Sequence, residues 1–245
     1  MKFKIRIANK NISIHSIYSS VYYSCKEYIV DDNEKTDIFV YVTEDMIEKE
    51  LIRFLKYDNY VNDTYVPSKS YLEIILIHKI IAEAILDYNT FLMHGAVIAV
   101  DGFSYMFMGT SGTGKTTHVL KWIENVEGSF IVNGDKPFII LKDEGAYACG
   151  TPWNGKENYG SNAIVSLRSI ILMERSDYNH IEPVSFNSIL PTLIEQTFFP
   201  DNPTGIRKTL KFLAALKDHV TFYRFYFNNF DDDAFLVPYN VLTNQ

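Results

Sequence analysis

Hydrophobic and polar residues alternate over short stretches at the start of the chain. Phe3, Ile5 and Ile7 alternate with polar residues, which predicts a strand. A second strand is predicted over residues 37–43 and a short helix over residues 43–55, with the acidic residues 31–34 as a solvated turn. Residues 1–66 are therefore expected to form a small α+β region.

The next stretch has helical spacing. Ser70 and Glu73 form a capping-box pair, in which each side chain can satisfy a free backbone N–H at the start of a helix. Four isoleucines recur on one helical face: Ile74, Ile77, Ile81 and Ile85. We expect a helix over residues 70–87.

The pattern changes to short apolar runs separated by glycine turns after residue 90. Strands are predicted over residues 91–100, 103–108, 130–132, 138–141, 146–149, 169–174 and 220–227, and helices over 117–123, 185–196 and 205–216. Residues 198–205 resemble a turn-rich linker. Strict alternation of strand and helix is absent, so we expect an α/β chain tending to α+β. A core over residues 67–245 would follow the region 1–66.

Composition narrows the class of protein. With 245 residues, 47% hydrophobic and 22% charged, the chain can bury a substantial core and is expected to be soluble. Its formal net charge of −7 gives no reason to expect nucleic acid or an anionic membrane as a partner. Cys25 and Cys149 form no metal or disulfide pattern, and neither a signal peptide nor a membrane-spanning run is evident. A cytoplasmic location is expected.

A phosphate-binding motif follows the predicted strand 103–108. Gly109, Gly114, Lys115 and Thr116 have the spacing Gly-x4-Gly-Lys-Thr, and a helix is predicted directly afterwards. Glycines let backbone N–H groups point at an anion, lysine reaches the outer phosphates, and the threonine hydroxyl can bind Mg²⁺. The predicted nucleotide-binding residues are Gly109, Thr110, Ser111, Gly112, Thr113, Gly114, Lys115, Thr116 and Thr117.

Asp135 is the leading candidate for the acidic group that such a loop needs. It ends the short apolar run 130–132 after one helix, where a carboxylate can reach the metal of the loop. The alternative is that Asn133, Gly134 and Asp135 form only a β-turn, and a turn that carries the carboxylate satisfies both interpretations. We therefore expect Thr116 and Asp135 to hold Mg²⁺.

The ordered set of motifs resembles a known family. His94-Gly95-Ala96-Val97, a hairpin, the glycine motif and an aspartate after one helix are similar to the HPr kinase/phosphorylase family and its relatives of phosphoenolpyruvate carboxykinase fold. The resemblance covers about residues 70–240. It implies a core of mixed sheets with flanking helices, and an ATP- and Mg²⁺-dependent kinase of a serine hydroxyl. It places His94 near the transferred phosphate and matches Asp135 to the second of two paired aspartates.

The chain departs from that family at Gly134, where the resemblance would place the first aspartate, the general base. Three alternatives follow: Asp135 serves both roles, another group is the base, or nucleotide binds without efficient turnover. The family's phosphorylase segment is also absent. The chain is more similar to small kinase-like relatives, some of which accompany peptide-modification pathways.

Residues 150–157 form a second candidate segment. Pro152, Trp153 and Gly155 would stiffen a loop that presents Lys156, and similar stretches occur in the relatives just named. Lys156 would contact the transferred phosphoryl group; the alternative is an exposed loop with a solvated ion pair.

Other residues with reactive side chains carry weaker signals. His78 is expected to be structural, and His118 is expected to face solvent or to pack on a strand. Arg168, Arg175 and Arg207 could each supply a positive finger or a substrate clamp, but a surface position is expected for each. The remaining histidines lack metal-ligand spacing, so no zinc site is expected.

The sequence therefore predicts a kinase that uses ATP and Mg²⁺, with Asp135, His94, Lys115 and Lys156 as catalytic residues. His94 could equally be a packed strand histidine. A nucleotide-binding accessory module is the alternative, and an ATP-using carboxykinase is disfavoured by the short chain. The expected partners are a nucleoside triphosphate and a hydroxyl acceptor, which could be a peptide, a protein or a small molecule. A homo-oligomer and the base preference stay open.

Overall fold

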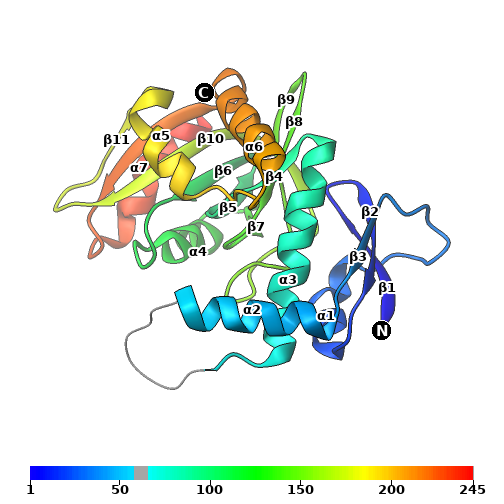
Figure 1. Cartoon of the computed structure of the whole chain (residues 1–245). Coiled ribbons are helices and arrows are strands. Elements are labelled where there is room, and N and C mark those ends of the chain that lie inside the picture. The colour runs from blue at the N-terminus through cyan, green and yellow to red at the C-terminus, as the bar shows by residue number, and fades with distance from the viewer. Residues whose placement is uncertain (58–65, 245) are drawn as a thin grey trace. The chain divides into compact units, whose positions relative to one another are not determined.

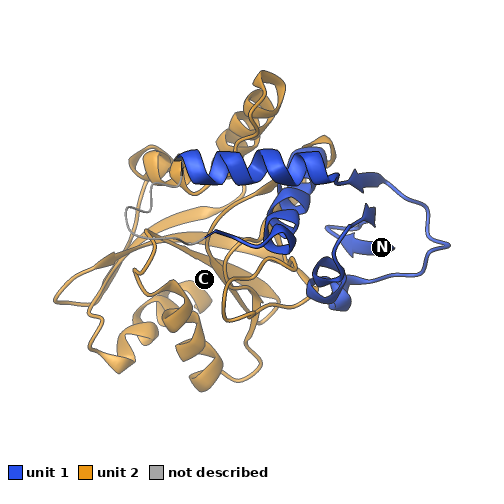
Figure 2. Ribbon diagram, turned by 60° about the horizontal axis from the view of Figure 1, so that its bottom comes forward, with its two compact units in different colours: residues 1–85 blue, residues 86–245 orange. Residues whose placement is uncertain are grey.

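The computed structural model describes residues 1–57 and 66–244, which divide into two compact units, 1–85 and 86–245 (Figures 1 and 2). The sequence placed a boundary at residue 66, next to residues 58–65, which lie outside the described residues. The observed boundary lies after Ile85 instead of at residue 66, because the helix Lys69–Ala84 contacts the helices and the third strand of the N-terminal unit.

The N-terminal unit is a three-stranded sheet with helices. Strands β1 and β2 form an antiparallel hairpin, and β3 runs parallel to β2 at the edge. Helix α3 packs on α1, α2 and β3. The elements are β1 (Lys2–Ile7), β2 (Lys10–His15), α1 (Ser19–Ser24), η1 (Lys26–Tyr28), β3 (Ile38–Tyr41), α2 (Glu44–Tyr57) and α3 (Lys69–Ala84).

Helix α3 confirms the predicted helix but not the capping pair. Ser68, rather than Ser70, caps it, and its side chain accepts from the Tyr71 N–H at 3.2 Å. Glu73 is fully buried, and its carboxylate accepts from the N–H groups of Ile17 (2.5 Å) and Tyr18 (2.9 Å). The glutamate therefore serves the start of α1, a contact between residues far apart in sequence that local spacing cannot reveal.

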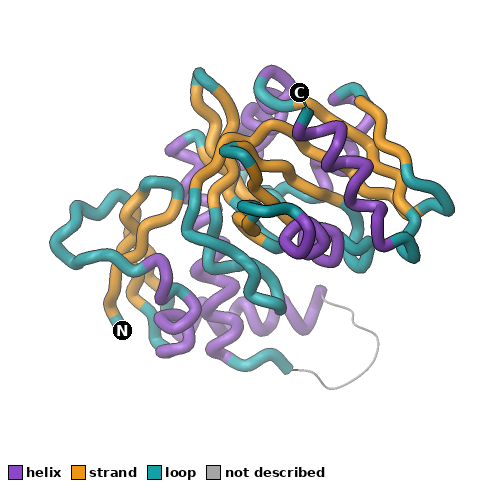
Figure 3. The backbone as a smooth tube through the Cα atoms, turned by 180° about the vertical axis from the view of Figure 1, so that it is seen from behind, coloured by secondary structure: helices purple, strands orange, loops and turns teal. Residues whose placement is uncertain are grey.

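The second unit is built on one large mixed sheet with the strand order β4-β8-β9-β10-β6-β5-β7. Strand β12 pairs in parallel with β10, and β11 pairs with β12. Figure 3 shows the strands of both units in orange. The elements are η2 (Ile85–Tyr88), β4 (Thr90–Leu92), β5 (Ala96–Val100), β6 (Phe103–Met108), α4 (Lys115–Asn125), β7 (Phe130–Asn133), β8 (Phe138–Lys142), β9 (Gly145–Cys149), β10 (Ile164–Arg175), β11 (His180–Pro183), α5 (Phe186–Glu195), α6 (Pro203–Ala215), η3 (Leu216–Asp218), β12 (Thr221–Phe227), η4 (Asp232–Phe235) and α7 (Leu236–Thr243).

Helices cover both faces of this sheet. One core cluster packs α5 and α6 against the strands through residues such as Leu193 and Phe212. The other packs α4 and the C-terminal helices through Trp122, Phe235 and Leu242. The fold is therefore a mixed α/β sheet with flanking helices, as the sequence predicted.

The predicted single strand 91–100 is wrong, because the chain breaks into β4 and β5 at residues 93–95. Gly95 lies so close to β6 that an added Cβ would come within 2.6 Å of Met106 Cε and 2.9 Å of the Phe107 carbonyl. The N–H of His94 donates to the Gln196 carbonyl at 2.7 Å instead of to a strand. The break places His94 at the end of the sheet.

The expected linker 198–205 is also partly wrong. Asn202 caps α6 by accepting from the Gly205 N–H at 2.8 Å, and Pro203 starts the helix. A proline at a first helical position is favourable because its missing N–H would have no partner there. The acidic run 231–233 is exposed and leads into η4, with the Asp231 side chain accepting from the Asp233 N–H.

Candidate functional site

The predicted strand, glycine loop and helix are present around the motif. Strand β6 ends at Met108 and α4 begins at Lys115. Gly112 (φ 76°) and Gly114 (φ 116°) adopt left-handed conformations, which side chains would strain. Thr113 closes the turn, because both its N–H and its hydroxyl donate to the Thr110 carbonyl, at 3.2 and 2.7 Å. We call residues 109–116 the glycine loop.

Lys115 lies under this loop rather than in solvent. Its ammonium donates to the carbonyls of Gly109 (2.9 Å) and Thr110 (3.2 Å), and the residue is only 8% exposed. Burial lowers the pKa of Lys115, and the negative charge of Asp135 partly opposes this shift. Thr116 and Thr117 follow in the first turn of α4, half-buried and exposed respectively.

His94 and Asp135 are brought together by the pairing of β5 with β7. The two strands are antiparallel, so the start of β5 lies beside the end of β7, and the Gly95 N–H donates to the Asp135 carbonyl at 2.8 Å. His94 Nε2 lies 2.8 Å from Asp135 Oδ1. Both side chains are half-buried. An ionised carboxylate only accepts, so His94 Nε2 carries the proton of this bond.

The carboxyl group of Asp135 stays ionised. Burial by itself would raise the pKa of Asp135, but the hydrogen bond and charge of His94 oppose it, and the pKa lies below its ordinary value. Lys136, whose Nζ is 3.9 Å from Oδ2, and Lys115 add to the lowering. The glycine loop, Lys115 and the His94–Asp135 pair thus share one edge of the sheet.

Asn133 holds Asp135 in place, a role that the sequence analysis did not assign. The fully buried Asn133 Oδ1 accepts from the N–H groups of Asp135 (2.9 Å) and Lys136 (2.6 Å). Its Nδ2 donates to the Thr151 hydroxyl at 3.0 Å and carbonyl at 3.2 Å. The sequence indicates the Asn-Gly turn, but it does not indicate the hydrogen bonds of Asn133 to Thr151.

The position of Gly134 is closed by the segment 150–161. The Gly134 N–H donates to the Tyr159 carbonyl at 2.9 Å, and an added Cβ would lie 3.0 Å from the Asn154 carbonyl oxygen and 3.1 Å from that of Tyr159. Both neighbours are backbone atoms. A side chain at this position, including the aspartate that the family resemblance implies, would displace the segment.

The segment 150–161 also reaches Asp135. An added Cβ on Gly155 would lie 3.3 Å from Asp135 Cβ, so the backbone of Gly155 packs on that carboxylate residue. Lys156 follows directly, and its side chain is exposed. The fold therefore places Lys156 next to Asp135. Among the described residues, its ammonium contacts none of the other candidate residues.

Arg175 contacts the glycine loop, whereas a surface position was favoured for it over a finger or substrate clamp. It ends β10, which runs parallel to β6 with Leu172 opposite Met108, so both strands end at the same edge. Arg175 Nη2 donates to the Gly112 carbonyl at 2.5 Å and Nε to the Thr113 carbonyl at 3.4 Å. A cavity of about 440 Å³ lies beside the loop, lined by residues 109–113, residues 172–175, Thr192 and Glu195.

Two histidines outside this edge of the sheet are buried. His118 packs on a strand, one of the two positions expected for it, and His78 is structural, as predicted. His118 is buried against Phe107, with ring centroids 4.5 Å apart, and its Nε2 accepts from Trp122 Nε1 at 3.3 Å. Burial lowers the pKa of His118 to about 3. His78 is buried within α3.

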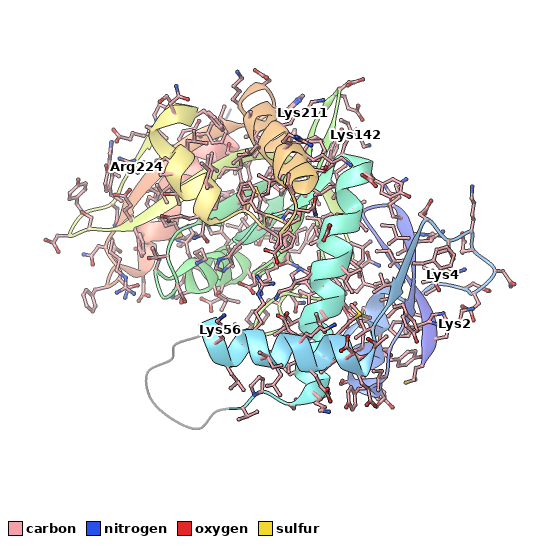
Figure 4. The ribbon with its side chains drawn as sticks, in the orientation of Figure 1. Lys2, Lys4, Lys56, Lys142, Lys211 and Arg224 are labelled. Carbon is pink, nitrogen blue, oxygen red and sulfur yellow. The ribbon has the colours of Figure 1, made fainter. Side chains whose placement is uncertain are left out.

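Glu174, which lines the cavity, is paired with a cation of the next strand. Arg224 on β12 forms an ion pair with Glu174, with Nε and Oε1 3.1 Å apart; Figure 4 labels Arg224. No local pattern in the sequence predicts this pair, because β10 and β12 are far apart in the chain.

The chain is similar in structure to solved proteins. No family model matches the chain, and no curated protein matches it. The structure of the Hpr(Ser) kinase/phosphatase from Coxiella burnetii is similar over 62% of this chain and 89% of its own, with 11% sequence identity and a TM-score of 0.36. A similarity of this size supports no conclusion about function. In the described part of the chain, no helix is long and apolar enough to cross a membrane.

Proposed function

We propose that this protein is an ATP- and Mg²⁺-dependent kinase that transfers the terminal phosphoryl group of ATP to a hydroxyl acceptor. The acceptor would be a serine of a peptide or protein, or a small molecule. The observation that carries the proposal is the convergence of the glycine loop, the buried Lys115 and the ionised Asp135 on one edge of the sheet.

Binding would use the backbone of residues 109–117. The N–H groups of the loop and of the first turn of α4 attract anions, since a helix N-terminus carries partial positive charge. Lys115 adds a charge at the outer phosphates. The cavity beside residues 109–113 offers further room for part of a ligand.

Thr116 and Asp135 would hold the Mg²⁺. A hydroxyl and an ionised carboxylate are oxygen donors, and Mg²⁺ is commonly bound by one or two carboxylates together with phosphates and water. Two protein oxygen donors leave the remaining positions around Mg²⁺ to phosphate and water. When bound, Mg²⁺ would neutralise charge on the outer phosphates.

The transfer requires a group to accept one proton. The acceptor oxygen forms a bond to the terminal phosphorus, the bond from that phosphorus to the bridging oxygen breaks, and ADP leaves. The hydroxyl proton would pass to the His94–Asp135 pair, in which Asp135 Oδ2 and His94 Nδ1 are the atoms not engaged in their mutual hydrogen bond. Lys156, presented beside Asp135 by Gly155, would steady the phosphoryl group.

A second candidate function is a nucleotide-binding accessory module without efficient transfer. It is favoured by the closed position of Gly134, because any side chain at this position would meet the backbone oxygens of Asn154 and Tyr159 at its first carbon. The lowered pKa of Asp135 also makes its carboxylate a weaker base.

Labelled ATP with Mg²⁺ and a panel of serine peptides, proteins and small hydroxyl compounds tests the proposal. We expect transfer to at least one acceptor, lost by more than 100-fold in Lys115→Ala and Asp135→Asn, since such groups typically contribute that much. Lys156→Ala should lower turnover about 10-fold or more without unfolding the protein. Lys142→Ala is a matched control, because this exposed lysine on β8 pairs with Glu144. Tight ATP binding without transfer or hydrolysis in any mixture would favour the module.

A further inference from the structure

We propose that Arg175 is a positioning residue that sets the glycine loop for binding phosphate. This inference rests on the proposed function in one respect, namely that the loop binds a nucleoside triphosphate. It adds a residue that neither the motif nor the family resemblance includes.

The contacts of Arg175 fix two successive peptide units of the loop. Its guanidinium donates to the carbonyls of Gly112 and Thr113, at 2.5 and 3.4 Å. A guanidinium is a rigid fork of donors, so holding two neighbouring carbonyls with one side chain restricts the rotation of both peptide planes.

Fixing a carbonyl also fixes the N–H of the same peptide unit. In a planar trans peptide the two groups point in opposite directions. The Thr113 carbonyl shares its unit with the Gly114 N–H, and this carbonyl is turned towards Arg175. The Gly114 N–H is therefore directed away from Arg175, at the residue that caps α4. An oriented N–H at this position is what a loop needs for an anion.

Two glycines make this restraint necessary. Gly112 and Gly114 have the left-handed φ values that the loop requires, and glycine has the largest freedom to leave such conformations. Thr113, between them, is tied to Thr110 by its N–H and hydroxyl. Arg175 restrains the Gly112 and Thr113 carbonyls of the same turn and comes from a strand that is fixed in register with β6.

Charge supports the same role. Lys115 lies beneath the loop, where its ammonium donates to the Gly109 carbonyl. Arg175 adds a second positive group beside the loop. Arg175 and the loop also line the same cavity. A preset loop loses less conformational freedom when it binds, which improves affinity.

Calorimetric titration with Mg-ATP and with Mg²⁺ plus inorganic tripolyphosphate tests the inference on the full chain. Arg175→Ala should weaken the binding of both ligands about 10-fold, since a hydrogen bond from a charged group contributes roughly that much. Arg175→Lys should restore part of the affinity, because an ammonium can reach one carbonyl but does not match the fork geometry. The matched control is Arg207→Ala, which removes an exposed arginine of α6 that contacts Thr204, and it should change neither affinity by more than about twofold.

Several results would overturn the inference. These are unchanged affinity for both ligands in Arg175→Ala, an equal loss in Arg207→Ala, or a loss for ATP but not for tripolyphosphate, which would make Arg175 a nucleoside contact. If Arg175→Ala does not fold, the comparison of Arg175→Lys with the wild type decides. Wild-type protein that binds neither ligand would refute both this inference and the proposed function. Binding without transfer would refute only the kinase activity.

Discussion

At the scale of single residues, Gly134 shows how a backbone contact decides which side chain a position accepts. Gly134→Ala would place a Cβ 3.0 Å from the Asn154 carbonyl oxygen and 3.1 Å from that of Tyr159. Both are backbone atoms, which cannot rotate away as a side chain can. We expect a loss of about 1–3 kcal/mol in the free energy of unfolding, which is typical of overpacking. Urea unfolding measures it.

Gly134→Asp tests the same contact from the side of function. We expect faster amide hydrogen exchange over residues 150–161 and no gain in turnover, because the new carboxylate would displace the segment that presents Lys156. A stable Gly134→Asp variant with higher activity would show that the position is open to a base.

His118 makes stability depend on pH. Its folded-state pKa of about 3 lies below the ordinary unfolded value of about 6.5, so the folded state favours the neutral ring. The stability from this group is complete above pH 6.5 and is lost as the pH falls from 6.5 towards 3. Between pH 7 and pH 5 the wild type should lose about 2 kcal/mol through His118, and His118→Gln should show a flatter profile. Urea unfolding at both pH values checks this, and equal slopes would contradict it.

At the scale of elements, Glu73 shows one helix stabilising the start of another. Helix α1 has no side-chain cap of its own, and the carboxylate from α3 accepts from the N–H groups of Ile17 and Tyr18 at its start. Because the carboxylate is fully buried, Glu73→Ala leaves two N–H groups without this acceptor. We expect a loss of about 2–4 kcal/mol and faster amide exchange over residues 17–24.

The control for Glu73 is Glu48→Ala, which removes an exposed partner of Lys69 on the neighbouring helix α2. An exposed ion pair contributes little, so the change should stay below about 1 kcal/mol. Similar losses in the two variants would mean that burial at Glu73 has no special effect.

Elements with strong local patterns could be predicted from the sequence. The apolar run of β10 over residues 169–174 is visible because both of its faces are covered, whereas the first residues of this strand, 164–168, are mostly half-exposed and were missed. The break between β4 and β5 was also missed, because it depends on the close packing of Gly95 on Met106 and Phe107. These contacts form only when the strands of the sheet are paired, so the local sequence does not show them.

At the scale of the whole molecule, the chain divides into two compact units, and both tryptophans, Trp122 and Trp153, lie in the second. Tryptophan fluorescence therefore reports the unfolding of the unit that carries the glycine loop. With Mg-ATP at about 100 times its Kd, that unit should gain about 2.7 kcal/mol, since a ligand that binds only the folded state stabilises it by mass action.

Amide exchange of residues 2–15 reports the other unit, whose first two strands are β1 and β2, with Lys2 and Lys4 labelled in Figure 4. We expect these amides to change little when Mg-ATP binds. Equal protection of both units by Mg-ATP would show instead that they unfold as one cooperative body.

The sequence by itself determined the glycine motif, its setting between a strand and a helix, and the mixed α/β class, because these depend on glycine conformations and on hydrophobic periodicity along short stretches. It also selected His94, Lys115 and Asp135 as candidates. Only the tertiary structure decided that His94 and Asp135 form a hydrogen-bonded pair, that the backbone of residues 150–161 closes Gly134, and that Arg175 holds the loop. Each of these depends on strand pairing between distant segments, which brings together residues that no local pattern connects.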